Sequence, residues 1–145
     1  MCIHGFGGNA DQFRYNLPAL ADATNSPSYA IDLLGYGYSD KPSPKEFGVN
    51  KLYNFENWAD QTTDFIRDEI KEPVILVCNS VGGVVGLQAA VNHPELIKGV
   101  VLINISLRLL TTRKMSALQR PLVSLLQNTL RETNIGKYFF DQIAT

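Results

Sequence analysis

Cysteine, net charge and long apolar runs are all scarce in this sequence, and each scarcity excludes a class of protein. Only two of the 145 residues are cysteines, too few for the disulfide framework of a small secreted domain. A net charge of −1 gives no electrostatic case for a nucleic-acid partner. No apolar run approaches the roughly 20 residues of a membrane-spanning helix, so we expect no transmembrane segment.

The chain does have enough apolar residues to bury a core. Hydrophobic residues make up 45% of the sequence and charged residues 19%, and the length is near the common size of one domain. No group of cysteine, histidine and acidic residues has the spacing of metal ligands. We therefore expect a folded domain without a metal ion or a bound cofactor.

The sequence is organised around residues 74–83. A β-branched apolar run at 74–78 predicts a strand that is buried on both faces of a sheet. After Ser80, small residues recur at helical spacing and would let a helix lie close against that sheet: Gly82, Gly86, Ala89 and Ala90. A serine between such a strand and such a helix lies on a sharp turn, with its hydroxyl at the carboxyl end of the strand.

This arrangement is the one that the G-x-S-x-G nucleophile elbow requires. Here the stretch reads Cys78-Asn79-Ser80-Val81-Gly82-Gly83, so that cysteine, which is still small, occupies the first glycine position. Ser80 is the candidate nucleophile. The alternative is an ordinary serine that N-caps a helix after a strand, and the elbow pattern alone does not decide between the two.

A second glycine loop, His4-Gly5-Phe6-Gly7-Gly8, follows the first predicted strand. Backbone N–H groups in a loop before a helix can face an anion. If Ser80 is a nucleophile, its tetrahedral oxyanion needs two donors, and we predict the N–H groups of Phe6 and Val81. We expect His4 to bond to the loop backbone. The alternative is a glycine turn that only connects a strand to a helix.

The same region also fits a dinucleotide site. Gly5-Phe6-Gly7-Gly8-Asn9-Ala10 matches G-x-G-x-x-G/A, and Asp32 ends the next predicted strand where a ribose-binding acid would lie. Two features count against this alternative. His4 is polar where the pattern needs an apolar residue, and the turn at Ser80 would be left without a purpose.

A serine nucleophile needs a base, and the base needs an acid that orients it. The sequence contains two histidines. His4 lies in the loop beside the predicted oxyanion hole, and His93 precedes Pro94 at the end of a predicted helix. We expect neither histidine to act as the base for Ser80.

Strands and helices alternate along residues 1–105, which predicts an α/β fold with a central parallel sheet and helices on both faces. Strands are expected at residues 1–3, 29–31, 74–79 and 99–104, the last one buried, and helices at about 10–23, 55–70 and 81–92. Residues 106–145 show no strand pattern, and their apolar spacing predicts two amphipathic helices that would suit a lid over a site. Cys2 and Cys78 are expected to be buried thiols on neighbouring strands, close enough to approach one another.

Four stretches together resemble the α/β-hydrolase superfamily: the loop at 4–8, the glycine- and tyrosine-rich loop at 32–42, the elbow at 79–83 and residues 93–102. They look most like the plant and cyanobacterial branch that includes pheophytinase and chlorophyll dephytylase. The resemblance covers nearly all of residues 1–105. It implies a Ser80 nucleophile, an oxyanion hole at Phe6 and Val81, a small hydrophobic ester as substrate and a chloroplast location. The residues that would support these motifs are His4, Gly5, Gly7, Cys78, Asn79, Gly82 and Gly83.

The resemblance also implies an incomplete domain. In the family, two strands precede the His-Gly loop and two more follow the helical cap, and those later strands carry the acid and the histidine. Residues 1–105 would then be the nucleophile half of the core and 106–145 the start of the cap. Alone, such a chain is expected to turn over little or no substrate. The alternative is a non-catalytic form that binds an apolar ligand or a partner, or self-associates through uncovered sheet edges.

Overall fold

The computed structural model describes residues 1–43, 45 and 49–105. Contacts divide the chain into two compact units, residues 1–105 and 106–145. The second unit, where the start of a helical cap is predicted, lies outside the described residues. The sheet and helices that follow belong to the first unit.

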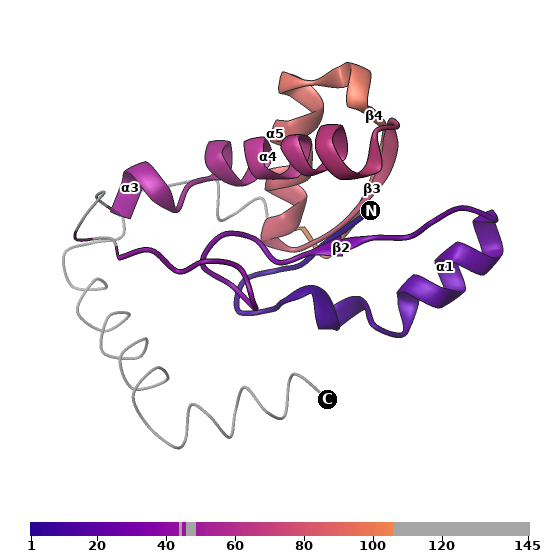
Figure 1. The fold of residues 1–145 in the computed structure, drawn as a ribbon, viewed down its shortest axis with the longest axis horizontal. Helices are drawn as coiled ribbons and strands as arrows, with labels where there is room; N and C mark the ends of the chain where they lie inside the picture. The colour runs from indigo at the N-terminus through magenta and orange to yellow at the C-terminus, as the bar shows by residue number, and fades with distance from the viewer. Residues whose placement is uncertain (44, 46–48, 106–145) are drawn as a thin grey trace. The chain divides into compact units, whose positions relative to one another are not determined.

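Four short strands form a parallel sheet in the order β2-β1-β3-β4. They are β1 (Cys2–Ile3), β2 (Ala30–Ile31), β3 (Val74–Asn79) and β4 (Ile97–Ile103). The chain enters β1 at the N-terminus and runs towards the left-hand side of Figure 1, so the carboxyl ends of the parallel strands point that way. The predicted parallel sheet of an α/β fold is confirmed.

Helices lie on both faces of this sheet, as predicted. Figure 1 shows α4 (Phe55–Phe65) and α5 (Val81–Asn92) above the sheet and α1 (Asn16–Thr24) below it. Shorter helical segments connect these elements: η1 (Ala10–Phe13), α3 (Val49–Leu52), η2 (Ile66–Ile70) and η3 (Pro94–Leu96). Within the described ranges, none of the helices has both the length and the apolar character that crossing a bilayer demands.

The helix expected over residues 10–23 is divided into two segments. A 3-10 turn, η1, ends at Phe13, and α1 begins at Asn16. Pro18 explains the division, because proline lacks an N–H and its ring clashes with the carbonyl four residues earlier in a continuous helix. A start at Asn16 puts Pro18 in the first turn of α1, where proline is tolerated.

The helix expected over residues 55–70 keeps its length but changes its geometry. Asn54 caps α4 by accepting a hydrogen bond from the Asn57 N–H at 2.7 Å, as an N-cap asparagine should. After Phe65 the chain continues as the π-helical segment η2 and ends at Lys71, whose φ is 62°. A positive φ at the residue after the last turn is a common way to end a helix.

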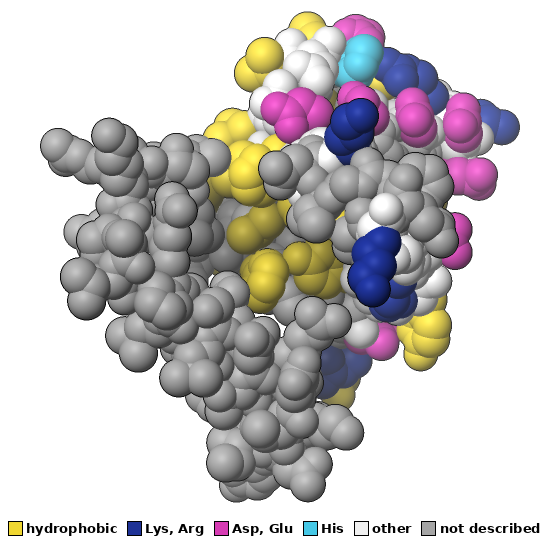
Figure 2. Space-filling model, turned by 90° about the vertical axis from the view of Figure 1, so that its left-hand side faces the viewer, with side chains coloured by type: hydrophobic (Ala, Val, Ile, Leu, Met, Phe, Trp, Pro, Cys, Tyr) yellow, Lys and Arg dark blue, Asp and Glu magenta, His cyan; other side chains and the backbone are white. Residues whose placement is uncertain are grey.

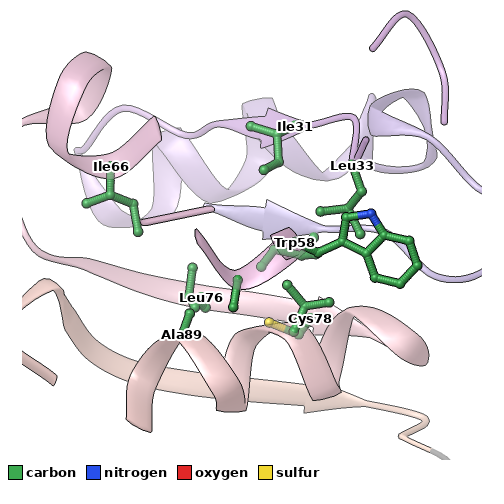
Figure 3. Packing of buried hydrophobic residues seen from close by; sticks show 10 residues of the cluster. Ile31, Leu33, Trp58, Ile66, Leu76, Cys78 and Ala89 are labelled. Carbon is green, nitrogen blue, oxygen red and sulfur yellow. The ribbon is translucent and has the colours of Figure 1, made fainter. Parts of the chain in front are cut away.

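The sheet face beneath α4 and α5, which we call the covered face, carries the main core. Ile3 pairs with Cys78 in the parallel register, so both side chains point to this face, and Leu76 does so by the two-residue period of a strand. All three are fully buried. The cluster, drawn in Figure 3, is Ile3, Ile31, Leu33, Trp58, Ala59, Ile66, Leu76, Cys78, Val85 and Ala89.

The opposite face, which we call the open face, is only partly covered by described residues. Ile75 is 54% exposed, Val101 48% and Ile103 45%, and the register puts all three on the same side of the sheet. Helix α1 and η1 lie on this side but reach only part of it. Among the described residues, the expectations that the strand at 74–78 is buried on both faces and that the strand at 99–104 is buried are therefore wrong. Strand β4 lies at an edge of the described sheet, where fewer neighbours cover it.

Candidate active site

Ser80 lies at a sharp bend between β3 and α5. Its φ of 52° and ψ of −116° fall in a region that residues other than glycine rarely adopt. The Ser80 N–H donates to the Ile103 carbonyl at 2.9 Å, and the Gly83 N–H donates to the Ser80 carbonyl at 3.0 Å. A strained residue of this kind costs about 1–3 kcal/mol and persists only where its surroundings fix it. The strand, turn and helix expected around Ser80 are present.

The Ser80 hydroxyl does not cap α5. The side chain makes no hydrogen bond at the N-cap position, and the residue is partly exposed. An ordinary N-cap serine accepts a hydrogen bond from an N–H of the first helical turn. The structure therefore does not support the N-cap alternative, and it leaves the hydroxyl available to a ligand.

Glycines let the first turns of α5 lie directly on the sheet. A Cβ atom added to Gly82 would lie 2.6 Å from the carbonyl oxygens of both Ile3 and His4, and one added to Gly86 would lie 2.5 Å from the Cys78 sulfur. Both distances are far below normal contact. The predicted small residues are thus needed at these two positions, because any side chain there would clash with the backbone after β1 or with the Cys78 side chain of β3.

The glycine loop after β1 lies against the bend at Ser80. A Cβ atom added to Gly5 would be 3.1 Å from the Ser80 Cβ and 3.3 Å from the Asn79 side-chain nitrogen. The loop closes with a hydrogen bond from the Gly8 N–H to the Gly5 carbonyl at 3.1 Å, and Gly7 has a φ of 74°. A positive φ at the third position is what a type II turn requires, so glycine is needed there.

His4 is bonded to backbone through both ring nitrogens. Its Nε2 accepts a hydrogen bond from the Leu33 N–H at 3.1 Å, which leaves Nδ1 to donate to the Gly5 carbonyl at 2.8 Å. Burial lowers the pKa of His4 below its ordinary value, although the hydrogen bond to Gly5 and the charge of Asp32 act in the opposite direction. A neutral ring with both nitrogens occupied is not free to take a proton from Ser80.

Asp32 anchors the other end of the same loop. Its Oδ1 accepts a hydrogen bond from the Ala10 N–H at 2.6 Å, and its Oδ2 accepts one from the Tyr38 N–H at 2.7 Å. Residues 5–9 are therefore fixed at both ends to the carboxyl end of β2, through His4 on one side and Asp32 on the other. These bonds give Asp32 a structural role that the dinucleotide alternative did not foresee.

The N–H groups of Phe6 and Val81 are the predicted oxyanion donors. Phe6 is the second residue of the turn that lies on Ser80, and Val81 is the first residue of α5. Neither N–H donates a hydrogen bond to another described residue. The first N–H groups of a helix have no partner within the helix, so the Val81 N–H is a donor next to the bend. The Phe6 N–H is a second donor, in the adjacent loop.

Neither histidine stands beside Ser80 as a base. His93 lies at the other end of α5, a helix of 12 residues and so about 18 Å long. There its Nδ1 lies 2.8 Å from an Arg67 guanidinium nitrogen and 3.2 Å from a Glu95 carboxylate oxygen. These are the two histidines of the sequence, which agrees with the expectation that neither is the base.

The two cysteines are buried free thiols. Burial raises the pKa of the Cys78 thiol to about 12 and also raises that of Cys2, so neither is an activated nucleophile. Cys2 pairs with Val77 rather than with Cys78, and the two side chains therefore point to opposite faces of the sheet. The expectation that they approach one another is wrong. In the described ranges no cluster of His, Cys, Asp and Glu could hold a metal ion.

Sequence reasoning missed the anchoring role of Asp32. It was considered only as a ribose ligand, whereas the structure uses it to bind the backbone of two loops. A signal was present in the sequence, since an aspartate before a glycine-rich turn commonly bonds to the backbone of that turn. The half-buried Tyr36, which lies between the His4 and Trp58 rings, had no such signal.

The sequence of this chain matches one family of known proteins. A family model described as the alpha/beta hydrolase fold matches residues 1–140. The chain belongs to the alpha/beta hydrolase fold family. The parallel sheet with helices on its faces is the fold of this family.

Curated and solved proteins that this chain resembles include hydrolases and esterases, and also alcohol acetyltransferases of yeasts. The chain is 39% identical over 69 residues to the chloroplastic pheophytinase of Arabidopsis thaliana. It is 33% identical over 105 residues to the 2-hydroxymuconate semialdehyde hydrolase of a Pseudomonas species. A solved esterase from Exiguobacterium antarcticum superposes with a TM-score of 0.58 at 25% sequence identity.

The chain spans well under half the length of these alpha/beta hydrolases. The match covers 48% of this chain and 14% of the pheophytinase, and 70% of this chain and 34% of the Pseudomonas hydrolase. For the Exiguobacterium esterase the shares are 70% and 35%. The fold and the region around Ser80 are therefore compared with only part of each relative.

Proposed function

We propose that this chain carries the nucleophile half of a serine hydrolase site that cleaves a hydrophobic carboxylic ester. Ser80 is the nucleophile, and the N–H groups of Phe6 and Val81 form the oxyanion hole. The observation that carries the proposal is the strained bend at Ser80, whose hydroxyl is uncapped while the Gly5 loop lies against it. The likeness to esterases and to a chloroplastic pheophytinase supports an ester substrate and favours a chloroplast location.

The chemistry requires one group that the two histidines do not supply. As the Ser80 oxygen bonds to the ester carbonyl carbon, its proton must leave, and the alcohol departs when the tetrahedral intermediate collapses. His4 is occupied by backbone and His93 lies at the far end of α5. We therefore expect the chain alone to acylate slowly and to hydrolyse its acyl-enzyme more slowly still, because removing one member of a triad abolishes most of the rate.

This proposal is tested by trapping the acyl-enzyme. The full chain is incubated with p-nitrophenyl butyrate, with and without added imidazole as a replacement base, and butyrylated peptides are identified by mass spectrometry. We expect butyrylation at Ser80, faster with imidazole, and none at this position in Ser80→Ala. Ser26→Ala is the matched control, because the Ser26 hydroxyl only donates to the Thr24 carbonyl on an exposed turn.

Two results would contradict the proposal in different ways. Acylation spread over several serines and lysines, unchanged in Ser80→Ala, would exclude Ser80 as an activated nucleophile. Ser80-dependent turnover without imidazole, at the median enzyme rate of about 10 per second, would instead show that the chain holds a base and is not half of a site.

A second function, association of copies of this chain, is favoured by the exposed edge of the sheet. Strand β4 is one of the two edges of the described sheet, and Val101, Leu102 and Ile103 are all at least 41% exposed. An exposed apolar edge strand is a template for pairing with another strand. In this alternative the chain binds an apolar partner, here a second copy, and does not hydrolyse.

Sedimentation over a range of concentrations tests this association. We expect the wild-type chain to form dimers or larger species, and Val101→Lys to remain monomeric because a lysine on an edge strand opposes pairing. Val91→Lys makes the same substitution at a position of α5 that is 76% exposed and should associate like the wild type. A wild-type chain that is monomeric at every concentration would exclude this function.

A further inference from the structure

The loop that lies against Ser80 carries an exposed aromatic ring. Phe6 follows Gly5, the residue whose backbone lies against Ser80, and its side chain is 75% exposed. Burying a phenylalanine side chain is strongly favourable, so the exposed ring in this loop is available for a ligand to cover. Figure 2 looks at this end of the molecule, towards which the strands point, and exposed apolar side chains gather in the middle of that view.

The Phe6 ring is supported by a row of aromatic rings behind it. Its centroid lies 6.3 Å from that of Tyr36, with the ring planes at 77°. Tyr36 in turn lies 5.1 Å from the His4 ring at 68° and 6.0 Å from the Trp58 ring at 57°. Trp58 is fixed by a hydrogen bond from its Nε1 to the Leu34 carbonyl at 2.9 Å. In an edge-to-face contact of this kind at least one face of the Phe6 ring stays open.

The open ring is suited to a flat partner more than to an alkyl chain. An alkyl chain gains most from an enclosed channel that surrounds it, whereas a planar group needs only one ring face for offset stacking. The hollow of about 330 Å³ on the open face is lined by Phe13, Leu20, Val77 and Ile103 among others and does not include Phe6. Phe6 therefore acts as a surface and not as one wall of that hollow.

We propose that the side chain of Phe6 is a stacking platform beside Ser80 that selects esters carrying a planar aromatic group. The inference rests on the proposed ester hydrolase function, and it adds a specificity role to a residue whose backbone N–H faces the oxyanion. One residue then binds the reacting oxygen through its backbone and the planar group through its ring.

Ligand binding without chemistry provides the test. The full chain with Ser80→Ala is titrated with 2-naphthyl acetate, followed by naphthyl fluorescence, and with cyclohexyl acetate in competition. We expect the naphthyl ester to bind more tightly, and Phe6→Ala in the same background to weaken its binding about tenfold. Phe6→Leu should also weaken it, Phe6→Tyr should preserve it, and cyclohexyl acetate should change little in any variant. Circular dichroism checks that each variant keeps the fold, as expected for an exposed side chain.

The outcomes separate this inference from the proposed function. Equal losses for the naphthyl and cyclohexyl esters would overturn stacking, and unchanged binding in Phe6→Ala would overturn any contact with Phe6. Acylation of Ser80 by p-nitrophenyl butyrate is a separate measurement on the wild-type chain. Its failure would refute the proposed function, while Phe6-dependent binding of the naphthyl ester could still be observed.

Discussion

The two faces of the sheet are built differently. On the covered face, Leu76 and Cys78 are fully buried under α5, and glycines bring the helix into backbone contact. On the open face, Ile75 of β3 and Val101 of β4 are about half exposed. Alternating residues of β3 therefore experience a packed interior and a partly solvated surface. The covered face fixes the bend at Ser80, because the first turn of α5 is seated against β1 there.

The largest difference between the faces is expected from neighbouring residues of β3. Leu76→Ala should lower the free energy of unfolding by about 3 kcal/mol, because it leaves a cavity in a fully buried cluster. Ile75→Ala, one residue earlier and on the open face, should cost less than about 1 kcal/mol. Urea denaturation of the full chain measures both. Equal losses would mean that the open face is covered in solution.

Substitutions of two glycines test the same difference in packing, with a smaller expected loss of stability. Gly82→Ala should cost about 2 kcal/mol, because its Cβ would meet two carbonyl oxygens of β1 and the backbone must shift. Gly99→Ala is the matched control on β4, since nothing lies within 4 Å of the added Cβ. We expect it to be neutral or slightly stabilising. Thermal unfolding of the two variants measures the difference. A Gly82→Ala variant as stable as the wild type would refute the close packing of α5 against β1.

The smallest effect on the free energy of unfolding is expected from a change of pH that titrates His4, in the loop after β1. The pKa of His4 is lowered in the folded chain, so the unfolded chain takes up the proton first as the pH falls through 6.5. The free energy of unfolding should therefore decrease between pH 7 and the lowered folded pKa. His4→Gln should lose this part of the pH dependence, as urea midpoints at several pH values would show. His93→Gln is the control and should keep it; a dependence that survives His4→Gln would assign it elsewhere.

Much of the fold could be predicted from the sequence, because the spacing of apolar residues along the chain indicates which of them are buried. The runs at 74–79 and 99–104 predicted parallel strands, and the small residues after Ser80 predicted a closely packed helix. The same reasoning failed where the burial of a strand depends on which elements lie next to it in the fold. It treated 99–104 as buried, although β4 lies at an edge of the described sheet. It expected one helix over 10–23 that Pro18 would bend or shorten, whereas the structure has two separate segments.

The candidate site was predicted in part for the same reason. Ser80, Gly5 and Gly82 follow a local rule, since a tight turn and a close helix need small residues at fixed positions. The anchors of the loop follow no local rule. Asp32 and His4 are 28 positions apart, and only the folded chain shows that they hold the two ends of one loop.

The sequence by itself determined the order of strands and helices, the place of the bend and the residues small enough to form it, because these depend on near neighbours along the chain. The tertiary structure decided which face of β3 is covered, which nitrogen of His4 carries its proton and which two loops Asp32 binds. Those properties depend on groups brought together from distant positions, whose burial and hydrogen bonds exist only once the sheet has formed.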